Sequence, residues 1–401
     1  MGLVKKDKKP LGKIRATSTG ASGVETSPLR PTHLPKLAPC RTGCPNGTKI
    51  REVLLAIAQT EDRGMTYDES YKLAFDILAE RNPFPAVCGR VCPHPCEENC
   101  NRQYKDGAVA INSVERFIGD YALEHNFPLT KITDEAYPEK IAVIGAGPAG
   151  LSCAYQLARR GYKVTVYEAF SKPGGMLRYG IPKYRLPENV LDKEIQRIVD
   201  LGVEIKCNVA IGRDISYETI RNEYDAVFVG IGAHKGKSLG LPGEDAPNVF
   251  TGTEFLNRIN SGQKIDVGRK VLVVGGGDTA IDAARVSKRL GADVTILYRR
   301  TRTEMPARAE EIENAEEEGV IFDLLTAPVQ FIGDENGFVK AMECIKMELG
   351  EPDASGRRSQ VGSLAQRRLL QHRGQERRRQ GLFGKEARPI PGQVTAVVLA
   401  P

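Results

Sequence analysis

The segment Ile141-Ala142-Val143-Ile144-Gly145-Ala146-Gly147-Pro148-Ala149-Gly150 joins an apolar run to three closely spaced glycines. Its first four residues are apolar and predict a short buried strand, and Leu151 to Arg160 predict a helix beyond the glycines. This strand–turn–helix order is the context that a dinucleotide-binding fingerprint requires. Gly145 would make the tight turn, Gly147 would let the backbone approach a pyrophosphate, and Gly150 would let the helix pack closely on the strand.

The residues that follow complete this first nucleotide site. The next predicted strand, Lys163 to Tyr167, ends at Glu168, whose carboxylate can hold ribose hydroxyls. The helix N-terminus would supply N–H donors and a positive dipole to the phosphates. The alternative is a glycine turn without a ligand, and the presence of both strands, the helix and the acid argues against it.

A second fingerprint follows at Val271-Leu272-Val273-Val274-Gly275-Gly276-Gly277-Asp278-Thr279-Ala280. Two such motifs in tandem suggest one site for a flavin, FAD, and one for a nicotinamide. The strand after the second motif, Asp293 to Tyr298, ends in Arg299 and Arg300 rather than in an acid. Because arginines favour a 2′-phosphate by charge and bidentate hydrogen bonding, this end predicts NADPH over NADH. The alternative is that two surface arginines simply follow the strand.

Six of the nine cysteines gather ahead of the first fingerprint. These six are Cys40, Cys44, Cys88, Cys92, Cys96 and Cys100. Clustered thiols in a chain without an export signal indicate metal or Fe–S ligation in a reducing cytoplasm rather than a disulfide framework. Thiols at every fourth residue from Cys88 to Cys100, with prolines after Cys44 and Cys92, favour an Fe–S cluster. Structural zinc is the alternative, but it more often shows paired Cys-x2-Cys knuckles.

Helical patterns lie between the two groups of cysteines. Apolar residues recur at helical spacing over residues 50–58 and again over residues 71–78. The second helix is expected to stop near Asn82-Pro83, because a proline disfavours helical conformation in the residue before it. These helices can bring Cys40 and Cys44 back against the run from Cys88 to Cys100.

The composition narrows the class of protein. The chain of 401 residues is 41% apolar, and no apolar run approaches the ~20 residues of a membrane helix. Residues 1–36, rich in Lys, Ser, Thr, Gly and Pro, predict a disordered lead-in. The net charge of +6 comes from residues 357–401, which hold ten Arg or Lys against two Glu. The body of the chain therefore gives no support to a nucleic-acid partner.

Two further segments carry a family resemblance. They are Asn82-Pro83-Phe84-Pro85-Ala86-Val87-Cys88-Gly89-Arg90-Val91-Cys92-Pro93 and Pro173-Gly174-Gly175-Met176-Leu177-Arg178-Tyr179-Gly180-Ile181-Pro182-Lys183-Tyr184-Arg185-Leu186-Pro187. From about Cys40 to Gly356 the chain resembles the small subunit of glutamate synthase and the N-terminal half of dihydropyrimidine dehydrogenase. The resemblance implies flavin contacts at Gly174, Gly175, Leu177, Ile181, Arg185, Val209, Gly232 and Ala233.

The same resemblance implies a set of cluster ligands. For one [4Fe-4S] cluster the matching residues are Cys44, Cys92, Cys96 and Glu115. A second family cluster would use Cys40 and Cys100 with two upstream cysteines, whose positions fall near Thr32 and Pro35. Cys88 matches a position that is not a ligand, although its thiol can substitute. The segment from Ala38 to Ile50 also resembles the Fe–S flavoproteins associated with dissimilatory sulfite reductase.

These features predict an α/β fold, with an N-terminal α-helical Fe–S domain followed by two Rossmann-like domains of the flavin disulfide reductase type. The expected boundaries are a lead-in at 1–36, the Fe–S domain at 37–135, the first FAD-binding segment at 139–255, the NAD(P)-binding domain at 256–356 and an aberrant basic tail at 357–401. After Arg358 no strand–helix alternation follows, whereas the resemblance implies a second flavin-domain segment there. We therefore expect a flavin domain that is incomplete at its C-terminus, with Val394 to Leu399 able to form one strand.

The predicted function is that of an NAD(P)H-dependent FAD/Fe–S oxidoreductase of the cytoplasm. Electrons would pass from NAD(P)H through FAD to the [4Fe-4S] cluster, and then to a redox partner subunit or a ferredoxin-type acceptor. The resemblance implies a glutamate-synthase-like large subunit or a sulfur-metabolism reductase as that partner. No catalytic acid or base is expected, because hydride transfer to flavin needs alignment more than proton chemistry.

Two alternatives to this function stay open. One is a flavin disulfide reductase, which residues 256–350 disfavour because they hold Cys344 and no Cys-x-x-Cys. The other is a truncated, catalytically inert module that docks to the same partner.

Overall fold

The computed structural model describes residues 37–352, 358–370 and 396–399. The lead-in predicted for residues 1–36 lies outside the described residues, as does most of the basic tail. No helix in the described ranges is long and apolar enough to cross a membrane.

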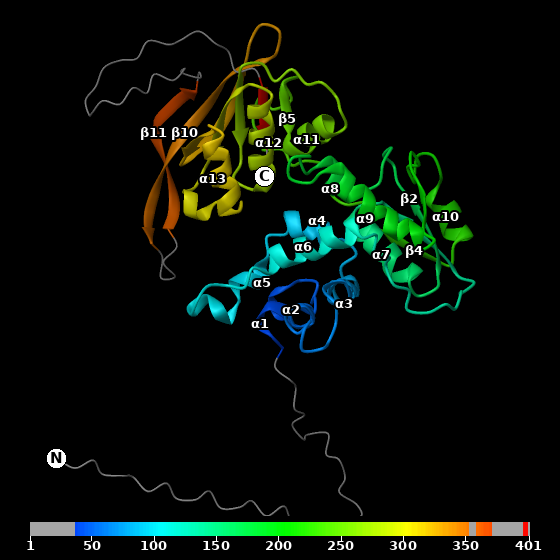
Figure 1. The fold of residues 1–401 in the computed structure, drawn as a ribbon. Coiled ribbons are helices and arrows are strands. Elements are labelled where there is room, and N and C mark those ends of the chain that lie inside the picture. The colour runs from blue at the N-terminus through cyan, green and yellow to red at the C-terminus, as the bar shows by residue number, and fades with distance from the viewer. Residues whose placement is uncertain (1–36, 353–357, 371–395, 400–401) are drawn as a thin grey trace, which may run out of the picture. The chain divides into compact units, whose positions relative to one another are not determined.

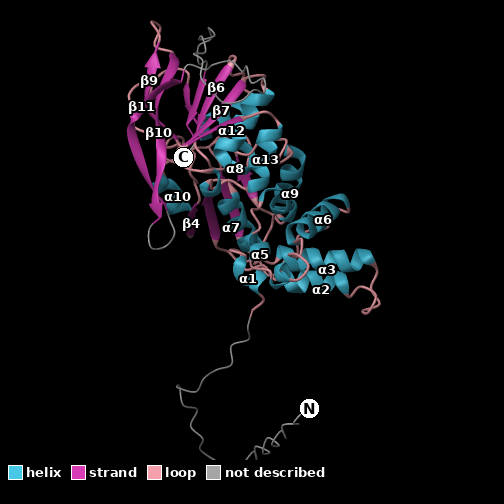
Figure 2. Ribbon diagram, turned by 90° about the vertical axis from the view of Figure 1, so that its left-hand side faces the viewer, coloured by secondary structure: helices cyan, strands magenta, loops and turns pink. Residues whose placement is uncertain are grey.

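The cysteine region folds as a group of short helices (Figures 1 and 2). The elements are α1 (Pro39–Gly43), α2 (Ile50–Ala58), α3 (Tyr67–Ala79), α4 (Pro85–Val91), α5 (Pro95–Glu98), the 3-10 turn η1 (Asn101–Tyr104) and α6 (Ile111–Glu124). The helices predicted over 50–58 and 71–78 are confirmed by α2 and α3. A capping box of Thr66 and Glu69 begins α3, which ends shortly before Asn82-Pro83 as expected. Phe75, fully buried, anchors α3 in the core.

Two glycines allow α4 and α6 to cross at close range. A Cβ atom on Gly89 would lie 2.3 Å from the Cα of Arg116, and one on Gly119 would lie 2.4 Å from the backbone nitrogen of Ala86. Any side chain at either position would therefore push the two helices apart. The crossing sets the Cys88 end of α4 against the part of α6 that carries Glu115.

The first fingerprint belongs to a four-stranded parallel sheet in the order β3-β2-β1-β4. The strands are β1 (Lys140–Ile144), β2 (Lys163–Tyr167), β3 (Glu204–Lys206) and β4 (Ala226–Val229), and the helices are α7 (Pro148–Ala158), α8 (Met176–Tyr179), α9 (Glu188–Asp200) and α10 (Tyr217–Glu223). Helix α7 packs on β1 and β2, which confirms the predicted strand–turn–helix unit. Three residues at the centre of this core, Val143, Leu151 and Val166, are fully buried.

The second fingerprint belongs to a five-stranded parallel sheet in the order β5-β12-β6-β7-β8. The strands are β5 (Val249–Thr251), β6 (Lys270–Val274), β7 (Asp293–Tyr298), β8 (Ile321–Leu324) and β12 (Ala396–Leu399), with α11 (Gly252–Asn260), α12 (Asp278–Arg289), η2 (Arg302–Glu304) and α13 (Ala309–Glu317). An antiparallel sheet in the order β11-β10-β9 adjoins it, built from β9 (Thr326–Gly333), β10 (Val339–Pro352) and β11 (Arg358–Leu370). Together with the first sheet, this arrangement confirms the predicted α/β class with two Rossmann-like units.

The C-terminal segment contributes two strands, β11 and β12, although the sequence predicted only one strand there. Strand β11 extends the antiparallel sheet beside β10. Strand β12 lies within the predicted strand Val394 to Leu399, and its Val397 and Val398 are fully buried. It lies between β5 and β6, so it completes the nicotinamide sheet and not the flavin sheet. Because β5 also pairs there, this sheet begins upstream of the predicted boundary at residue 256.

Among the described residues, the flavin sheet ends at β4. Phe228 and Val229 on that strand are 37% and 53% exposed, although both are large and apolar. The expectation of an incomplete flavin half stays a prediction.

Candidate functional site

A pocket of about 240 Å³ lies at the carboxyl end of β1 and β2, beside the first glycine turn. Gly145 adopts a φ of +101°, which favours glycine, and Gly147 stands just before α7. Eight of the residues predicted to bind FAD line this pocket: Gly145, Gly147, Pro148, Ala149, Glu168, Gly175, Val209 and Gly232. The N-terminus of α7 is thus open to a phosphate, as the fingerprint requires.

The other predicted flavin residues do not line the pocket. They are Gly150, Gly174, Leu177, Ile181, Arg185 and Ala233. Gly150 instead faces the strand, since a Cβ atom there would lie 1.9 Å from the carbonyl oxygen of Gly145. Three further residues of the pocket were not predicted: Phe170 and His234, which come from segments without a motif, and Met176, which lies within the quoted segment 173–187. The ring centroids of Phe170 and His234 are 5.1 Å apart, so the two side chains form one wall.

Glu168 is buried beside the glycine turn, and both of its carboxylate oxygens accept backbone hydrogen bonds. Oε2 accepts from the N–H of Ala146 at 2.7 Å, and Oε1 accepts from the N–H of Phe170 at 2.9 Å. These bonds fix the carboxylate in the wall of the pocket. Each oxygen still has a lone pair that could accept from a ribose hydroxyl.

The second glycine turn repeats this construction at the end of β6. A Cβ atom on Gly276 would lie 2.6 Å from the ring of Tyr298, and the φ of Gly275 is +141°. Gly277 stands just before α12, while Ala280 is fully buried in the position of the third small residue. These predicted residues therefore form a nucleotide-type turn.

Arg299 and Arg300 follow β7, the strand next to the second turn. The N–H of Gly275 donates to the carbonyl of Leu297 at 3.0 Å, which holds the two strand ends together. Both arginines are exposed. Their side chains are therefore available to an anionic group of a bound nucleotide.

Arg185 points toward the nicotinamide half of the chain. Its Nη1 donates to Oδ2 of Asp282 on α12 at 2.6 Å, and its Nε lies 3.2 Å from Oε1 of Glu311 on α13. All three side chains are buried. Burial raises the pKa of Asp282 to about 6, although the Arg185 hydrogen bond lowers it. Arg185 thus joins the two dinucleotide-binding halves.

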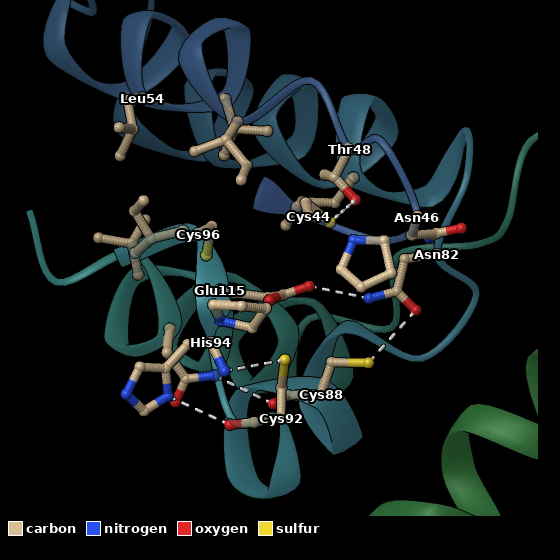
Figure 3. A pocket seen from close by; sticks show the side chains of 18 residues that line it. Cys44, Asn46, Thr48, Leu54, Asn82, Cys88, Cys92, His94, Cys96 and Glu115 are labelled. Carbon is tan, nitrogen blue, oxygen red and sulfur yellow. Dashed lines mark hydrogen bonds between the residues drawn. The ribbon is translucent and has the colours of Figure 1, made fainter. Parts of the chain in front are cut away.

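The cysteine region encloses a cavity of about 280 Å³ (Figure 3). Five of the predicted metal ligands line it: Cys44, Cys88, Cys92, Cys96 and Glu115. They come from the turn after α1, from α4 and its end, from α5 and from α6. Oε1 of Glu115 accepts from the side-chain amide of Asn82 at 2.8 Å, which fixes the carboxylate within the cavity.

The chemistry of these side chains suits a metal cluster. Burial raises the pKa of the Cys92 thiol and raises the pKa of Cys96 to about 12. Burial likewise raises the pKa of Glu115 to about 7. Bound metal cations would offset the free-energy cost of ionising these buried groups, because metal binding displaces protons from thiols.

The spacing of the thiols favours a cluster over a single ion. Four ligands of one Zn²⁺, each ~2.3 Å from the metal, must lie close together. The thiols of Cys44, Cys88, Cys92 and Cys96 stand around a cavity with room for several atoms. The residues therefore fit a multi-atom Fe–S cluster.

Cys40 and Cys100, the remaining predicted ligands, do not line this cavity. Cys40 packs against the cluster of Ile50, Cys96 and Ile111. Burial is the main cause that raises the pKa of the Cys40 thiol, and a charge on the nearby Cys100 thiol raises this pKa further. Backbone hydrogen bonds, led by that of Val109, lower the pKa of Cys100. The second cluster stays a prediction, because the positions near Thr32 and Pro35 lie outside the described residues.

Glu194 connects the flavin half to the helix that carries Cys88. This carboxylate on α9 is fully buried and accepts from the N–H groups of Ala86 at 2.8 Å and Val87 at 3.1 Å. It therefore caps the N-terminus of α4 from another domain. Burial raises its pKa to about 8, while these hydrogen bonds and the nearby Arg197 lower it.

Replacing Glu194 with glutamine is expected to lower the free energy of unfolding by about 1–3 kcal/mol, because one N–H of α4 loses its acceptor. In the wild type the folded-state pKa of about 8 exceeds the ordinary 4.5, so the stabilising contribution of Glu194 declines as the pH rises through 8. The glutamine variant should lack this component. Denaturant unfolding at pH 6 and pH 9 measures both effects, with Lys193→Gln at the exposed neighbouring position as the control. Equal stability of variant and wild type at both pH values would contradict the prediction.

Comparison with known proteins agrees with this geometry. Residues 139–386 match the family model of the pyridine nucleotide-disulphide oxidoreductases. Residues 34–127 match that of dihydropyrimidine dehydrogenase domain II, 4Fe-4S cluster. The chain therefore belongs to the pyridine nucleotide-disulphide oxidoreductase family, and it carries a 4Fe-4S domain ahead of the nucleotide-binding domains. The first match runs past Gly356, the expected end of the resemblance.

Within this family, particular relatives are similar over most of the chain. NADPH-Fe(3+) oxidoreductase subunit beta of Geobacter sulfurreducens is 44% identical over 327 residues, which are 80% of this chain and 47% of that protein. A putative glutamate synthase [NADPH] small chain of Cereibacter sphaeroides is 40% identical over 68% of this chain and 69% of that protein. The chain thus spans about half the length of the first relative. These matches confirm the predicted family and support FAD, NADPH and a 4Fe-4S cluster as its cofactors.

A solved structure shares the fold. Mycobacterium tuberculosis FprA in complex with NADPH aligns with a TM-score of 0.54 at 18% identity, over 66% of this chain and 70% of that one. At this identity the likeness concerns the arrangement of the chain alone, and it confirms the predicted flavin disulfide reductase type of fold.

Proposed function

We propose that this chain is an NADPH-dependent Fe–S flavoprotein that delivers electrons to a redox partner. The observation that carries the proposal is the convergence of four cysteines and Glu115 on one cavity, in a chain that also forms two nucleotide-type glycine turns. When bound, FAD can exchange a hydride for single electrons and a 4Fe-4S cluster can carry those electrons one at a time.

Each part of the chain would contribute binding and orientation. Gly147 and the N-terminus of α7 would receive the flavin pyrophosphate, and Glu168 the ribose. The second turn with Arg299 and Arg300 would hold NADPH. Cys44, Cys92, Cys96 and Glu115 would hold the cluster, with Cys88 as the further thiol of the cavity.

A disulfide reductase activity fits the structure less well. Cys344 on β10 is fully buried, and burial raises its pKa to about 12. A thiol of this kind is unreactive, because the thiolate is the attacking species. No second cysteine accompanies it in residues 256–350.

The test of the proposed function is an anaerobic titration of the iron- and sulfide-reconstituted chain with NADPH in the presence of added FAD. Both the flavin band and the broad Fe–S shoulder are expected to bleach. Cys92→Ser and Cys96→Ser should lose the shoulder and keep the flavin response, whereas Cys153→Ser, outside the cavity on α7, should keep both. Absence of bleaching in the wild type would refute the proposal.

Replacing Arg299 and Arg300 with alanine is expected to raise the KM for NADPH about 10–100-fold, because charge-assisted hydrogen bonds contribute about 1.5–3 kcal/mol. The KM for NADH should stay unchanged, since NADH lacks the 2′-phosphate. Steady-state ferricyanide reduction with each nucleotide measures the change. Arg302→Ala, at an arginine that pairs with Glu316, serves as the matched control. A parallel rise in both KM values would count against a phosphate site.

A second candidate function is a partner-docking module without electron transfer. The observation that favours it is the open side of the flavin pocket, where the lining residue Ile231 is 64% exposed. Flavin content after gel filtration separates the two candidates. Stoichiometric FAD would eliminate the inert module, and a folded, colourless chain that rejects added FAD would eliminate the enzyme.

The proposed function also requires a natural redox partner. Because the relatives named above include a beta subunit and a small chain, we infer a partner subunit, either a glutamate-synthase-like large subunit or a sulfur-metabolism reductase. The resemblance to flavoproteins of dissimilatory sulfite reductase stays a prediction.

A further inference from the structure

A basic hollow of about 670 Å³ adjoins the cysteine cavity and has no part in the site described above. Its lining combines the C-terminal end of α3, the turn after Cys44 and one face of α7. The lining residues are Asn46, Glu80, Arg81, Ile132, Ser152, Gln156, Arg159 and Arg160.

The three arginines of the hollow lack acidic partners. Arg159 donates to the carbonyl of Glu80 at 3.1 Å, Arg160 donates to Gln156, and Arg81 reaches only the carbonyl of Asn46 at 3.5 Å. The one carboxylate of the lining, Glu80, is paired with Lys49 at 2.6 Å. Among the described residues no carboxylate lies within ion-pair distance of any of the three arginines, so the hollow has an uncompensated positive charge.

One residue connects this hollow to the cysteine cavity. Asn46 lines both, and its side-chain amide donates to the carbonyl of Arg81 at 2.9 Å. Asn46 lies on the same turn as Cys44, where the N–H of Gly47 donates to the Cys44 carbonyl at 2.9 Å. Figure 3 shows Asn46 at the edge of the cavity that Cys44 and Cys92 line. Asn46 therefore forms part of the wall of both sites.

The hollow also has an apolar contact point. Ile132 is 55% exposed and lies among the charged residues. An exposed apolar side chain that shares a hollow with the exposed Arg81 and Arg160 has the composition of a protein-binding patch, in which an apolar centre is accompanied by a polar rim. A free small anion would make no use of it.

We propose that this hollow is the docking site of an acidic redox protein, which takes electrons from the cluster across the Asn46 turn. The inference rests on the proposed function and specifies its partner by charge. Oxidation of one NADPH to NADP⁺ and a proton releases two electrons, which reduce two one-electron acceptors. Positive charge beside the point of electron exit would attract and orient carboxylates of the partner.

The test uses an acidic [2Fe-2S] ferredoxin of the plant type as the probe, with the reconstituted full chain and NADPH. Ferredoxin-dependent reduction of cytochrome c is measured against ionic strength, after subtraction of the rate without ferredoxin. The wild-type rate is expected to fall steeply as salt increases. The double variant Arg81→Glu/Arg160→Glu should raise the KM for ferredoxin at least about tenfold and abolish the salt dependence. Arg221→Glu, an exposed arginine on α10 that lines neither cavity, should behave as the wild type.

The outcomes distinguish docking from the proposed function itself. NADPH-dependent ferricyanide reduction should be equal in all variants, and its absence in the wild type would refute the proposed function. Normal ferricyanide reduction together with an unchanged KM for ferredoxin in the double variant would overturn the docking proposal. Inhibition of the wild type by inorganic phosphate at constant ionic strength, absent in the double variant, would assign the hollow to a small anion and would also overturn it.

Discussion

Replacing Arg185 with leucine is expected to lower the free energy of unfolding by about 3–5 kcal/mol at pH 8, because a buried charge then loses its partner. Arg185 is the residue of the flavin half that forms buried ion pairs with both Asp282 and Glu311. In this variant Glu311 keeps Arg285 and Arg308 as partners, so Asp282 is the carboxylate that is left without an ion pair. The Oδ1 atom of Asp282 already lacks a hydrogen-bond partner.

The loss should depend on pH in a defined direction. The pKa of Asp282, raised to about 6 by burial, stands above its ordinary 3.8, so its stabilising contribution declines as the pH rises through 6. Without the Arg185 hydrogen bond, which lowers this pKa, Asp282 keeps its proton up to a higher pH. The variant should therefore be closer to the wild type at pH 5 than at pH 8.

Chemical denaturation at pH 5 and pH 8 measures this effect, and a double-mutant cycle locates it. Arg185→Leu/Asp282→Leu should recover most of the lost stability, because both charges are gone and the leucines can pack against each other. If the free energy of unfolding of Arg185→Leu at pH 8 lay within about 1 kcal/mol of the wild-type value, the Arg185–Asp282 pair would not hold the two halves together.

The sequence predicted the nucleotide turns and not the contact between the two halves, and Arg185 shows why. Gly145 and Gly275 were identified because a turn of this kind places local demands on the backbone that only glycine meets. Arg185 was assigned to the flavin by resemblance, whereas its side chain lies against α12 and α13. The direction of that side chain depends on how two halves of the chain pack, and no local pattern encodes it.

The flavin pocket and the tail illustrate the same limit. Phe170 and His234 form a wall of the pocket from segments far apart in the sequence, so neither has a periodic signal. Strand β12 is a run of four small and branched apolar residues, Ala396–Leu399. Such a run was recognisable as one strand, but its place between β5 and β6 depends on which sheet leaves a space between two strands.

The cysteine cavity was the better predicted site, because spacing and helices together constrain it. Cys44 was expected to return against the run that contains Cys92, and both line the cavity. The two glycines that let α4 cross α6, Gly89 and Gly119, were not singled out. Their role appears only when the second helix is in place.

Replacing Gly150 with alanine is expected to abolish FAD binding and to lower the free energy of unfolding by about 3 kcal/mol, at the upper end of overpacking effects. The added Cβ would lie 1.9 Å from the Gly145 carbonyl oxygen and 3.1 Å from Cγ1 of Val143. Backbone on one side and a buried strand residue on the other leave no room for adjustment. The N-terminus of α7 must move away from β1, and with it the N–H groups that would receive the pyrophosphate.

Gly147→Ala provides the matched comparison, because the two glycines of one fingerprint differ in what a methyl group would meet. At Gly147 the nearest atom is the Cα of Gly175 at 3.8 Å, an ordinary contact, so the FAD-free protein should keep the wild-type stability. The same methyl group enters the pocket where the pyrophosphate would approach, so the affinity for FAD should still fall. Thermal unfolding with and without FAD, together with flavin fluorescence titration, separates the two effects. If Gly147→Ala bound FAD as well as the wild type, or Gly150→Ala unfolded at the wild-type temperature, the roles assigned to these glycines would be wrong.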